Sequence, residues 1–257
     1  MSVDINQARL IELAEQIGVD PVYLEKDFVL TEIVHAYATG PHREQLVLKG
    51  GQALRHIYGS HRLSRDVDYV ARSRIEFESL RAGIAIRFPR LTVPVQPVGR
   101  TARGIKIDPI EYRGPLGNRD NVEVEVSFRE DLLLEPEWRP YANPFRETFP
   151  VLVMQVDEMV AEKIRAMYQR GNPRDLYDLW FIFSTPDISI NREVVADLVP
   201  RKVRPPFVAR GWQRSRLYER LLANKDDWSG LIAIAPDRPP IETALDVVET
   251  GLRFLPR

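Results

Sequence analysis

The sequence predicts an α+β protein, with a mixed β-sheet flanked by helices in its N-terminal half and a mainly helical C-terminal half. In residues 1–145, helical spacing of apolar residues is interspersed with short segments in which apolar and polar residues alternate. After residue 145 the spacing is almost wholly helical. The chain has 257 residues, of which 44% are hydrophobic, so it can fill a substantial core. We therefore expect an α/β domain over 1–145 and a helical domain over 146–257.

The first part of the chain predicts helices interleaved with strands. Apolar residues at helical spacing from Ala8 end at Gly18, and Asp20-Pro21 is typical of the cap and first turn of a new helix. Gly50-Gly51 indicates a tight turn after a short apolar strand. The elements expected in this part are, in chain order, a helix ending at Gly18, a helix over about 22–38, a strand over 45–49, a helix over 53–58, a strand over 66–71 and a helix near 74–87.

The middle of the chain predicts a half-covered sheet, and the remainder predicts helices. Alternating strands are expected at 91–93, 105–107 and 122–126, between turns rich in Gly and Pro. The segment 135–145 is rich in proline and aromatic residues and interrupts both periodicities, so it indicates a connector. The helices expected after it cover about 156–170, 173–183, 191–199, 207–223 and 241–254.

Composition excludes some classes of site and partner. The formal net charge is −1 although 28% of residues are charged, so a nucleic-acid partner is neither indicated nor excluded. The absence of cysteine excludes disulfides and thiolate metal sites, and the four histidines are not at zinc-ligand spacing. Asp4 and Glu12 lie where a signal peptide would be basic and then apolar, and no run approaches the ~20 apolar residues of a membrane span. We expect a soluble cytoplasmic protein without membrane association.

Asp66 and Asp68 are the strongest candidates for a metal site. Residues two apart on a strand project to the same face, so the two carboxylates point together. A divalent cation relieves their repulsion, and Mg²⁺ prefers carboxylate oxygens with its other positions filled by water and substrate phosphate. Gly50-Gly51, upstream, lets backbone amides approach a phosphate at a helix start. An Asp-x-Asp alone is equally consistent with a solvated strand edge, but the glycines favour the metal and phosphate interpretation.

Glu123 and Glu125 are candidates for a third metal-binding carboxylate. They alternate with valines, so both face one side of a strand. A site that binds two Mg²⁺ ions commonly uses three carboxylates. The alternative is a solvent-facing strand edge, which we favour for at least one of the two, because sheets commonly have one wet face.

The segment 158–183 carries cations and carboxylates on two successive helices. Lys163 and Arg170 lie two turns apart on a similar helix face, so both could reach one anion. Arg174, Asp175 and Asp178 occupy the first turns of the next helix. Lysine suits nucleotide phosphates, and a carboxylate can orient that lysine or hold a hydroxyl group. The alternative is a network of ion pairs within the helices, such as Glu162 with Arg165 or Arg174 with Asp178.

A basic run, 201–220, contains interleaved aromatic residues. Cations neutralise phosphates and aromatic faces stack on unpaired bases, so this segment could hold an RNA end. The alternative is a solvated helix face with aromatic side chains packed inward. The candidate RNA-binding residues are Arg201, Lys202, Arg204, Arg210 and Arg214.

The order of these motifs resembles the nucleotidyltransferase superfamily related to DNA polymerase β. More narrowly, it resembles the AbiEii family, the toxin nucleotidyltransferases of AbiE-type toxin–antitoxin and phage-defence systems. The segments that carry the resemblance are EKDFVLTEIV at 25–34, KGGQALRHIYG at 49–59, LSRDVDYV at 63–70, VEVEVSFRE at 122–130 and DEMVAEKIRAMYQRGNPRDLYDLWFIF at 157–183.

This resemblance implies that the protein transfers a nucleoside monophosphate from an NTP to RNA, with loss of pyrophosphate. The implied cofactor is Mg²⁺ or Mn²⁺, the implied acceptor is the 3′ end of tRNA, and the implied outcome is inhibition of translation. A cognate AbiEi-like antitoxin encoded nearby would restrain the toxin. Two alternatives remain: a nucleotidyl or phosphoryl transferase that modifies protein, and a non-catalytic member that binds nucleotide or RNA.

The resemblance also assigns candidate site residues by position. Ser64, Asp66 and Asp68 fall on the Ser-x-Asp-x-Asp of the family, Lys163 on its helical lysine, and Asp175 with Asp178 on its Arg-Asp-x-x-Asp; these six are the candidate catalytic residues. The candidate metal ligands are Asp66, Asp68 and Glu125, with Glu123 less favoured. The candidate phosphate ligands are Lys49, Gly50, Gly51, Arg65 and Arg174. Gln52 follows the glycines where the superfamily often has a hydroxyl side chain, so we expect that hydroxyl contact to be missing.

Overall fold

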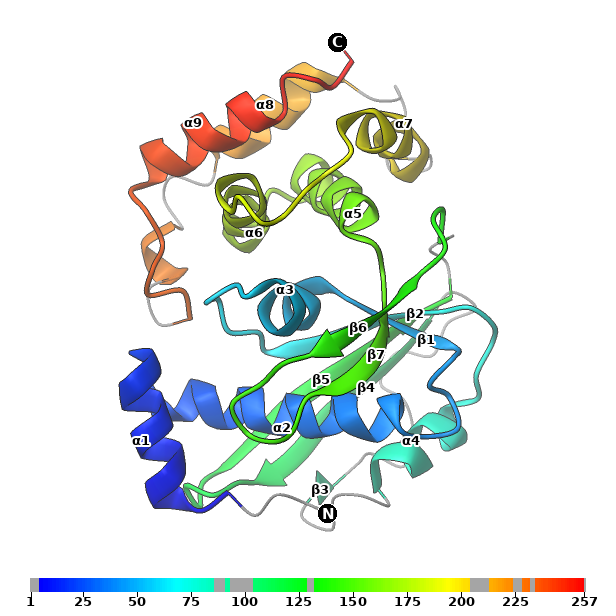
Figure 1. Cartoon of the computed structure of the whole chain (residues 1–257), viewed down its shortest axis with the longest axis vertical. Coiled ribbons are helices and arrows are strands. Elements are labelled where there is room, and N and C mark those ends of the chain that lie inside the picture. The colour runs from blue at the N-terminus through cyan, green and yellow to red at the C-terminus, as the bar shows by residue number, and fades with distance from the viewer. Residues whose placement is uncertain are drawn as a thin grey trace. The chain divides into compact units, whose positions relative to one another are not determined.

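The structure, a computed structural model, divides into two compact units. It describes residues 5–85, 91–92, 104–128, 132–203, 213–223, 228–231 and 234–256. One unit is Met1–Met154 and the other is Gln155–Arg257. Figure 1 shows the sheet and its helices in the first unit and helices alone in the second. The predicted α+β class is confirmed.

The first unit is a mixed sheet with helices on both faces. Its described elements are α1 (Gln7–Ile17), α2 (Pro21–Ala38), β1 (Leu46–Lys49), α3 (Gly50–Tyr58), β2 (Asp66–Ala71), α4 (Phe77–Ala85), β3 (Leu91–Thr92), β4 (Gly104–Arg113), β5 (Arg119–Ser127), β6 (Glu137–Tyr141) and β7 (Phe149–Val153). Within the described residues the strand order is β3-β4-β5-β2-β1-β7-β6. β2, which carries Asp66 and Asp68, lies between β1 and β5. It pairs with β1 in antiparallel and with β5 in parallel orientation.

The two faces of β2 meet different helices. Tyr69 points to one face, where its ring packs edge-on against Tyr37 of α2 at 5.6 Å between centroids. The hydroxyl of Tyr37 in turn donates to the carbonyl of Leu80 in α4. Asp68 points to the opposite face, where α3 begins. Figure 1 shows α3 on one side of the strands and α2 with α4 on the other. The acidic pair therefore lies on the face of the sheet that carries α3.

Most predicted helix boundaries are confirmed, with one instructive difference at α3. Asp20 caps α2 by accepting a hydrogen bond from the Val22 amide at 2.8 Å, and α1 ends at Gly18 in the left-handed conformation. We expected a Gly-Gly turn followed by a helix from residue 53. Instead, Gly50 and Gly51 are themselves the first residues of α3. The periodicity did not reveal this because glycine contributes no apolar side chain to it.

The predicted connector at 135–145 is wrong. This segment contains β6, and β7, which follows it, was not predicted. β6 is an edge strand, where Pro140 is tolerated because a missing amide does not break a ladder on both sides. The boundary expected after residue 145 falls between these two paired strands, whereas the compact unit extends to Met154.

The second unit is helical, as predicted. Its described elements are α5 (Val156–Gln169), α6 (Pro173–Ser184), α7 (Arg192–Lys202), α8 (Arg214–Leu222), a 3₁₀ turn (Trp228–Leu231) and α9 (Ile241–Gly251). Asn172 caps α6 by accepting from the Arg174 amide, and Pro173 occupies the first turn. Parts of three expected elements, residues 86–87, 93 and 207–212, lie outside the described residues. Along the described ranges, no helix is both long and apolar enough to span a membrane.

A buried ionic cluster joins α2 to α3. Asp27 is fully buried and accepts hydrogen bonds from Arg55 Nε at 2.8 Å, His56 Nε2 at 3.0 Å and Gln52 Nε2 at 3.1 Å. Burial by itself raises the pKa of the Asp27 carboxyl, but the charges and hydrogen bonds of Arg55 and His56 outweigh it. The pKa of Asp27 therefore lies well below its usual range.

A strand residue completes this cluster. The Tyr141 hydroxyl, at the end of β6, donates to Gln52 Oε1 at 2.6 Å and lies 3.3 Å from Thr31 Oγ1 of α2. Its ring stacks on that of His56 with 4.4 Å between centroids. Gln52 is fully buried in these contacts, so its amide serves the fold rather than the surface on which a phosphate would bind.

Asp27→Asn is expected to lower the free energy of unfolding by roughly 3–5 kcal/mol at neutral pH, because it leaves buried Arg55 uncompensated. Since the folded-state pKa of Asp27 is lowered, its charge stabilises the fold above the unfolded-state pKa of about 4. This contribution is lost as the pH falls below that value toward the folded-state pKa. Urea unfolding should therefore show that the difference in free energy of unfolding between wild type and variant becomes smaller below about pH 4. A difference that does not change with pH would contradict the stabilising role of the ionised Asp27 carboxylate.

Candidate functional site

The first turn of α3 lies against the acidic strand β2. Lys49, the last residue of β1, pairs with Asp68 in antiparallel register. Gly50 has φ +70°, and a Cβ at this position would collide with the carboxylate of Asp68. A Cβ on Gly51 would lie 2.7 Å from Ser64 Oγ and 2.8 Å from Arg62 Nη2. Both positions therefore require glycine, and the backbone at the helix start is closely surrounded by polar side chains.

Ser64 orients the first aspartate of the pair. Its hydroxyl is almost fully buried and donates to Asp66 Oδ1 at 2.8 Å. Because the same hydroxyl lies against Gly51, it links the start of α3 to the start of β2. Ser64 thus restrains the Asp66 carboxylate without neutralising it, which suits a carboxylate that is to bind a cation.

The four candidate carboxylates share one face of two adjacent strands. In the parallel pairing of β2 with β5, Asp66 is opposite Glu123 and Asp68 is opposite Glu125. Residues opposite each other in a ladder project to the same face, so the predicted common face is confirmed. Val124, between the glutamates, is buried on the other face. This alignment accumulates negative charge on one surface of the sheet.

Lys106 distinguishes the two glutamates. It lies on β4 and forms ion pairs with Glu123 at 2.8 Å and Asp108 at 3.2 Å. The hydrogen bond that Lys106 donates to Glu123 is the largest cause of the raised pKa of Lys106. Glu125 is exposed and forms no hydrogen bond or ion pair with any residue that the structure describes. Glu125 is therefore the better candidate for a third metal ligand, as the sequence interpretation preferred.

The donor set suits a hard divalent cation. Asp66, Asp68 and Glu125 supply only carboxylate oxygens, the ligands that Mg²⁺ and Mn²⁺ accept most readily. Within the described ranges, no three His, Cys, Asp or Glu side chains converge as a ready-made metal cluster. The chemistry of the donors fits the ion, and their role as metal ligands stays a prediction.

In the helical unit, Lys163 joins the two predicted aspartates. Its ammonium lies 2.7 Å from Asp178 Oδ2 and 3.2 Å from Asp175 Oδ1. Arg170 adds two hydrogen bonds to Asp175, at 3.0 and 3.2 Å. Both carboxylates are almost fully buried, whereas the Lys163 side chain keeps 14% exposure. These pairs connect α5 with α6, and the two aspartates hold the lysine in position.

The remaining phosphate candidates lie in different settings. Lys49 is half-buried beside Asp68 at the end of β1. Arg65 is exposed, with its guanidinium 5.7 Å from the ring centre of Tyr23. Arg174 is half-buried in the first turn of α6. Their phosphate contacts stay predictions.

Lys202 lies in a setting that does not favour the predicted RNA contact, which stays a prediction. Its side chain is only 6% exposed, and its ammonium lies 2.6 Å from Glu158 and 3.0 Å from Glu162 of α5. These ion pairs hold α7 against α5. Arg201 is exposed and pairs with Asp197, while Arg214 bonds the Tyr218 hydroxyl and carbonyls of the C-terminal segment. Arg204 and Arg210 lie outside the described residues.

Two basic residues near the candidate site were missed. Arg62 is 4% exposed and packs over Gly51, and Lys106 pairs with Glu123. The alternation Ile105-Lys106-Ile107 indicated that Lys106 faces away from the core, but only the strand pairing places it beside the glutamates. No sequence pattern indicated that Arg62 is buried.

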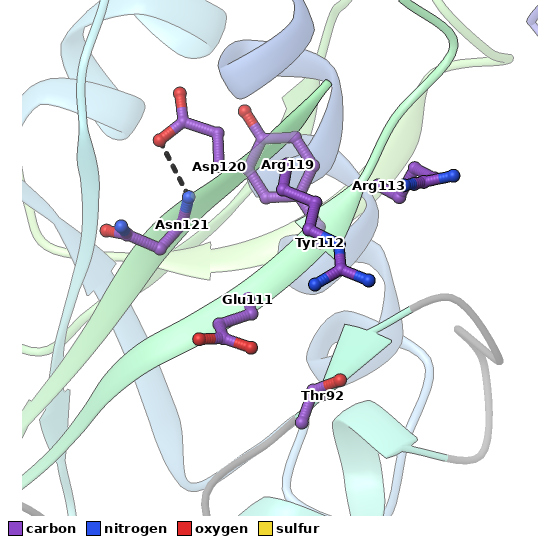
Figure 2. A pocket seen from close by; sticks show the side chains of 7 residues that line it. All are labelled: Thr92, Glu111, Tyr112, Arg113, Arg119, Asp120 and Asn121. Atoms are coloured by element: carbon purple, nitrogen blue, oxygen red, sulfur yellow. Dashed lines mark hydrogen bonds between the residues drawn. The ribbon is translucent and has the colours of Figure 1, made fainter. Parts of the chain in front are cut away.

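A separate cavity of about 400 Å³ lies near the hairpin that joins β4 to β5. Figure 2 shows its side chains on β3, β4 and β5, with the Asn121 amide bonded to Asp120. The lining residues are Thr92, Glu111, Tyr112, Arg113, Arg119, Asp120 and Asn121. None of them is a predicted site residue, so the candidate site is defined by its carboxylates and glycines rather than by this cavity.

The model of a family described as the nucleotidyl transferase AbiEii toxin of a type IV toxin–antitoxin system matches residues 33–247. The chain belongs to this family. It is therefore a toxin nucleotidyltransferase, an NTP-dependent enzyme, and its family implies an antitoxin partner. The match spans all six candidate catalytic residues. No curated protein matches the chain.

Solved structures show the same fold as this AbiEii protein. The nucleotidyltransferase toxin MenT4 from Mycobacterium tuberculosis is 19% identical, with a TM-score of 0.65 over 95% of this chain and 99% of MenT4. JHP933 from Helicobacter pylori is 18% identical, with a TM-score of 0.60 over 92% of this chain and 93% of that protein. Both likenesses extend through the sheet and the helices.

Gly50→Ala is expected to reduce NTP-dependent transfer by at least about tenfold, because its Cβ would displace Asp68 or the start of α3. Gly59→Ala is the matched control. Gly59 ends the same helix at φ +80° but has open space around it, so both variants carry a backbone cost of roughly 1–2 kcal/mol. Equal activity of the two variants, measured where both are folded, would contradict this account of the helix start.

Lys202→Met is expected to lower the free energy of unfolding by roughly 3–5 kcal/mol, because it leaves buried Glu158 and Glu162 without their cation. Arg201→Met, one residue earlier, removes only an exposed pair within its own helix and should cost about 0.5 kcal/mol or less. Urea unfolding followed by circular dichroism measures both. Similar destabilisation by the two substitutions would show that Lys202 is not an internal cation.

Proposed function

We propose that this AbiEii toxin transfers a nucleoside monophosphate from an NTP to RNA, at the 3′ end of tRNA, and thereby inhibits translation. The observation that carries the proposal is the close packing of Gly50 and Gly51 against Asp68 and Ser64. This packing brings backbone amides, which suit phosphate, next to carboxylates, which suit a divalent cation.

The described residues of the first unit supply the nucleotide-binding half of the reaction. The amides at the start of α3, with Lys49 and Arg62 close by, would bind oxygens of the triphosphate. Asp66, Asp68 and Glu125 would hold Mg²⁺ or Mn²⁺, whose positive charge would offset the charge that develops on pyrophosphate. Ser64 would keep Asp66 in the orientation that this requires.

The transfer itself is an in-line displacement. A hydroxyl group of the acceptor attacks the α-phosphorus, the bond to pyrophosphate breaks, and positioning with charge neutralisation provides most of the catalysis. Lys163 is proposed to contact the triphosphate, because a lysine ammonium is a compact cation well suited to phosphate. Asp175 and Asp178 hold its side chain in position.

The acceptor and the specific partner are part of the proposal. We propose the 3′ end of tRNA as the acceptor and an AbiEi-like antitoxin, encoded nearby, as the partner that restrains the toxin. Membership of a type IV toxin–antitoxin family supports the general class of partner. The exposed arginine Arg201 and the part-exposed Arg214 are the described members of the basic run that remain candidates for RNA contact.

Asp66→Ala is expected to reduce NTP-dependent labelling of RNA by at least about 10²-fold. The reason is that the metal ion proposed to neutralise the triphosphate would lose one of its carboxylate ligands. The assay incubates purified protein with total tRNA, Mg²⁺ and each labelled NTP in turn. Asp187→Ala removes an exposed aspartate outside the site and should leave labelling unchanged.

Undiminished labelling by Asp66→Ala would refute the site assignment. Mass spectrometry of the same mixture identifies the acceptor: added nucleotide mass on tRNA supports the proposal, and added mass on a protein supports the alternative of a protein-modifying transferase. Failure of the wild type to bind NTP in the presence of Mg²⁺, measured by calorimetry, would favour a non-catalytic member.

A further inference from the structure

Three side chains on one face of α3 converge on the same buried carboxylate. Gln52, Arg55 and His56 have the spacing i, i+3, i+4, which places them along one stripe of a helix. All three donate to Asp27 of α2, at 3.1, 2.8 and 3.0 Å. Because the contacts are spread along the helix and share one acceptor group, they restrain both the rotation of α3 about its axis and its position along that axis.

His56 extends the restraint to the end of β6. Its Nδ1 lies 3.0 Å from the Ala142 carbonyl, and the Ala142 amide donates back to the His56 carbonyl at 3.0 Å. The imidazole ring of His56 therefore lies between the Asp27 carboxylate and the end of β6, and links α3 to both.

The first turn of this restrained helix is the proposed phosphate-binding element. Gly50 and Gly51 immediately precede Gln52, so the direction of their amides is determined by how Gln52, Arg55 and His56 are held. Contacts in a reaction site tolerate displacements of only about 0.5 Å, and a misplacement of ~1 Å can cost about 10²-fold in rate.

We propose that Asp27 is a positioning residue of the nucleotide site: through Gln52, Arg55 and His56 it orients α3 so that Gly50 and Gly51 bind the triphosphate. This inference rests on the proposed function. Asp27 does not contact the nucleotide. It acts on NTP affinity through the helix, so its loss raises the KM for NTP more than it lowers kcat, since the phosphate contacts are made already in the ground state.

The chain offers a matched control on the same helix. Glu32 is a second buried carboxylate of α2, and it pairs with Arg146 at 2.8 Å, in the segment between β6 and β7 rather than in α3. Asp27→Asn and Glu32→Gln each replace a buried carboxylate by its isosteric amide and each leave a buried arginine uncompensated. Only Asp27→Asn removes the shared acceptor of α3.

The test compares NTP saturation curves for wild type, Asp27→Asn and Glu32→Gln at a temperature where all are folded by circular dichroism. We expect Asp27→Asn to raise the KM for NTP at least tenfold with kcat lowered less than threefold, and Glu32→Gln to leave the KM within twofold of wild type. A KM for Asp27→Asn that stays within threefold of that for Glu32→Gln would overturn the proposal.

Tyr141→Phe provides a milder probe if Asp27→Asn does not fold. It removes the hydroxyl that donates to Gln52 and keeps the ring that stacks on His56. We expect at least a threefold rise in the KM for NTP, and an unchanged KM would overturn the proposal. Failure of the proposed function is distinguishable, because the wild type itself would then neither bind NTP nor label RNA.

Discussion

The fully buried carboxylate of Asp27 sets the placement of α3 against α2 in the first unit. A carboxylate without water must be compensated, and here the compensation comes almost entirely from α3. The need to compensate the Asp27 carboxylate therefore also fixes where α3 lies. Because α3 begins with Gly50 and Gly51, this buried cluster holds the helix whose first turn is the proposed phosphate-binding element.

The carboxylates on the face of the sheet next to α3 differ in the partners that hold them. Ser64 restrains Asp66 with a neutral hydrogen bond, whereas Lys106 neutralises Glu123 with an ion pair. Glu125 keeps an exposed carboxylate. The sheet face therefore carries carboxylates in different settings: Asp66 bonded to a hydroxyl group, Glu123 in an ion pair and Glu125 exposed. This difference would keep the repulsion between aligned carboxylates tolerable before nucleotide and metal bind.

In the helical unit a cation, rather than a carboxylate, is held by oppositely charged neighbours. Lys163 is a single cation between two buried aspartates, and Arg170 supplies a second cation to Asp175. The lysine is thus held in position between the two carboxylates. Lys202 shows the opposite outcome: two glutamates surround it so closely that its charge is internal to the unit. Lys163 and Lys202 are the same residue type, and they differ in burial: the side chain of Lys163 keeps 14% exposure and that of Lys202 keeps 6%.

Side-chain periodicity and local capping predict the α+β class, most helix positions, and the common face of Asp66 and Asp68. The sequence also placed Lys163, Asp175 and Asp178 on two successive helices. Four outcomes became visible only in the folded chain: Glu123 pairs with Lys106, Lys202 is internal, Gln52 belongs to a buried cluster, and residues 137–141 form an edge strand. Those outcomes depend on strand register and on contacts between residues far apart in the chain, which no local pattern encodes.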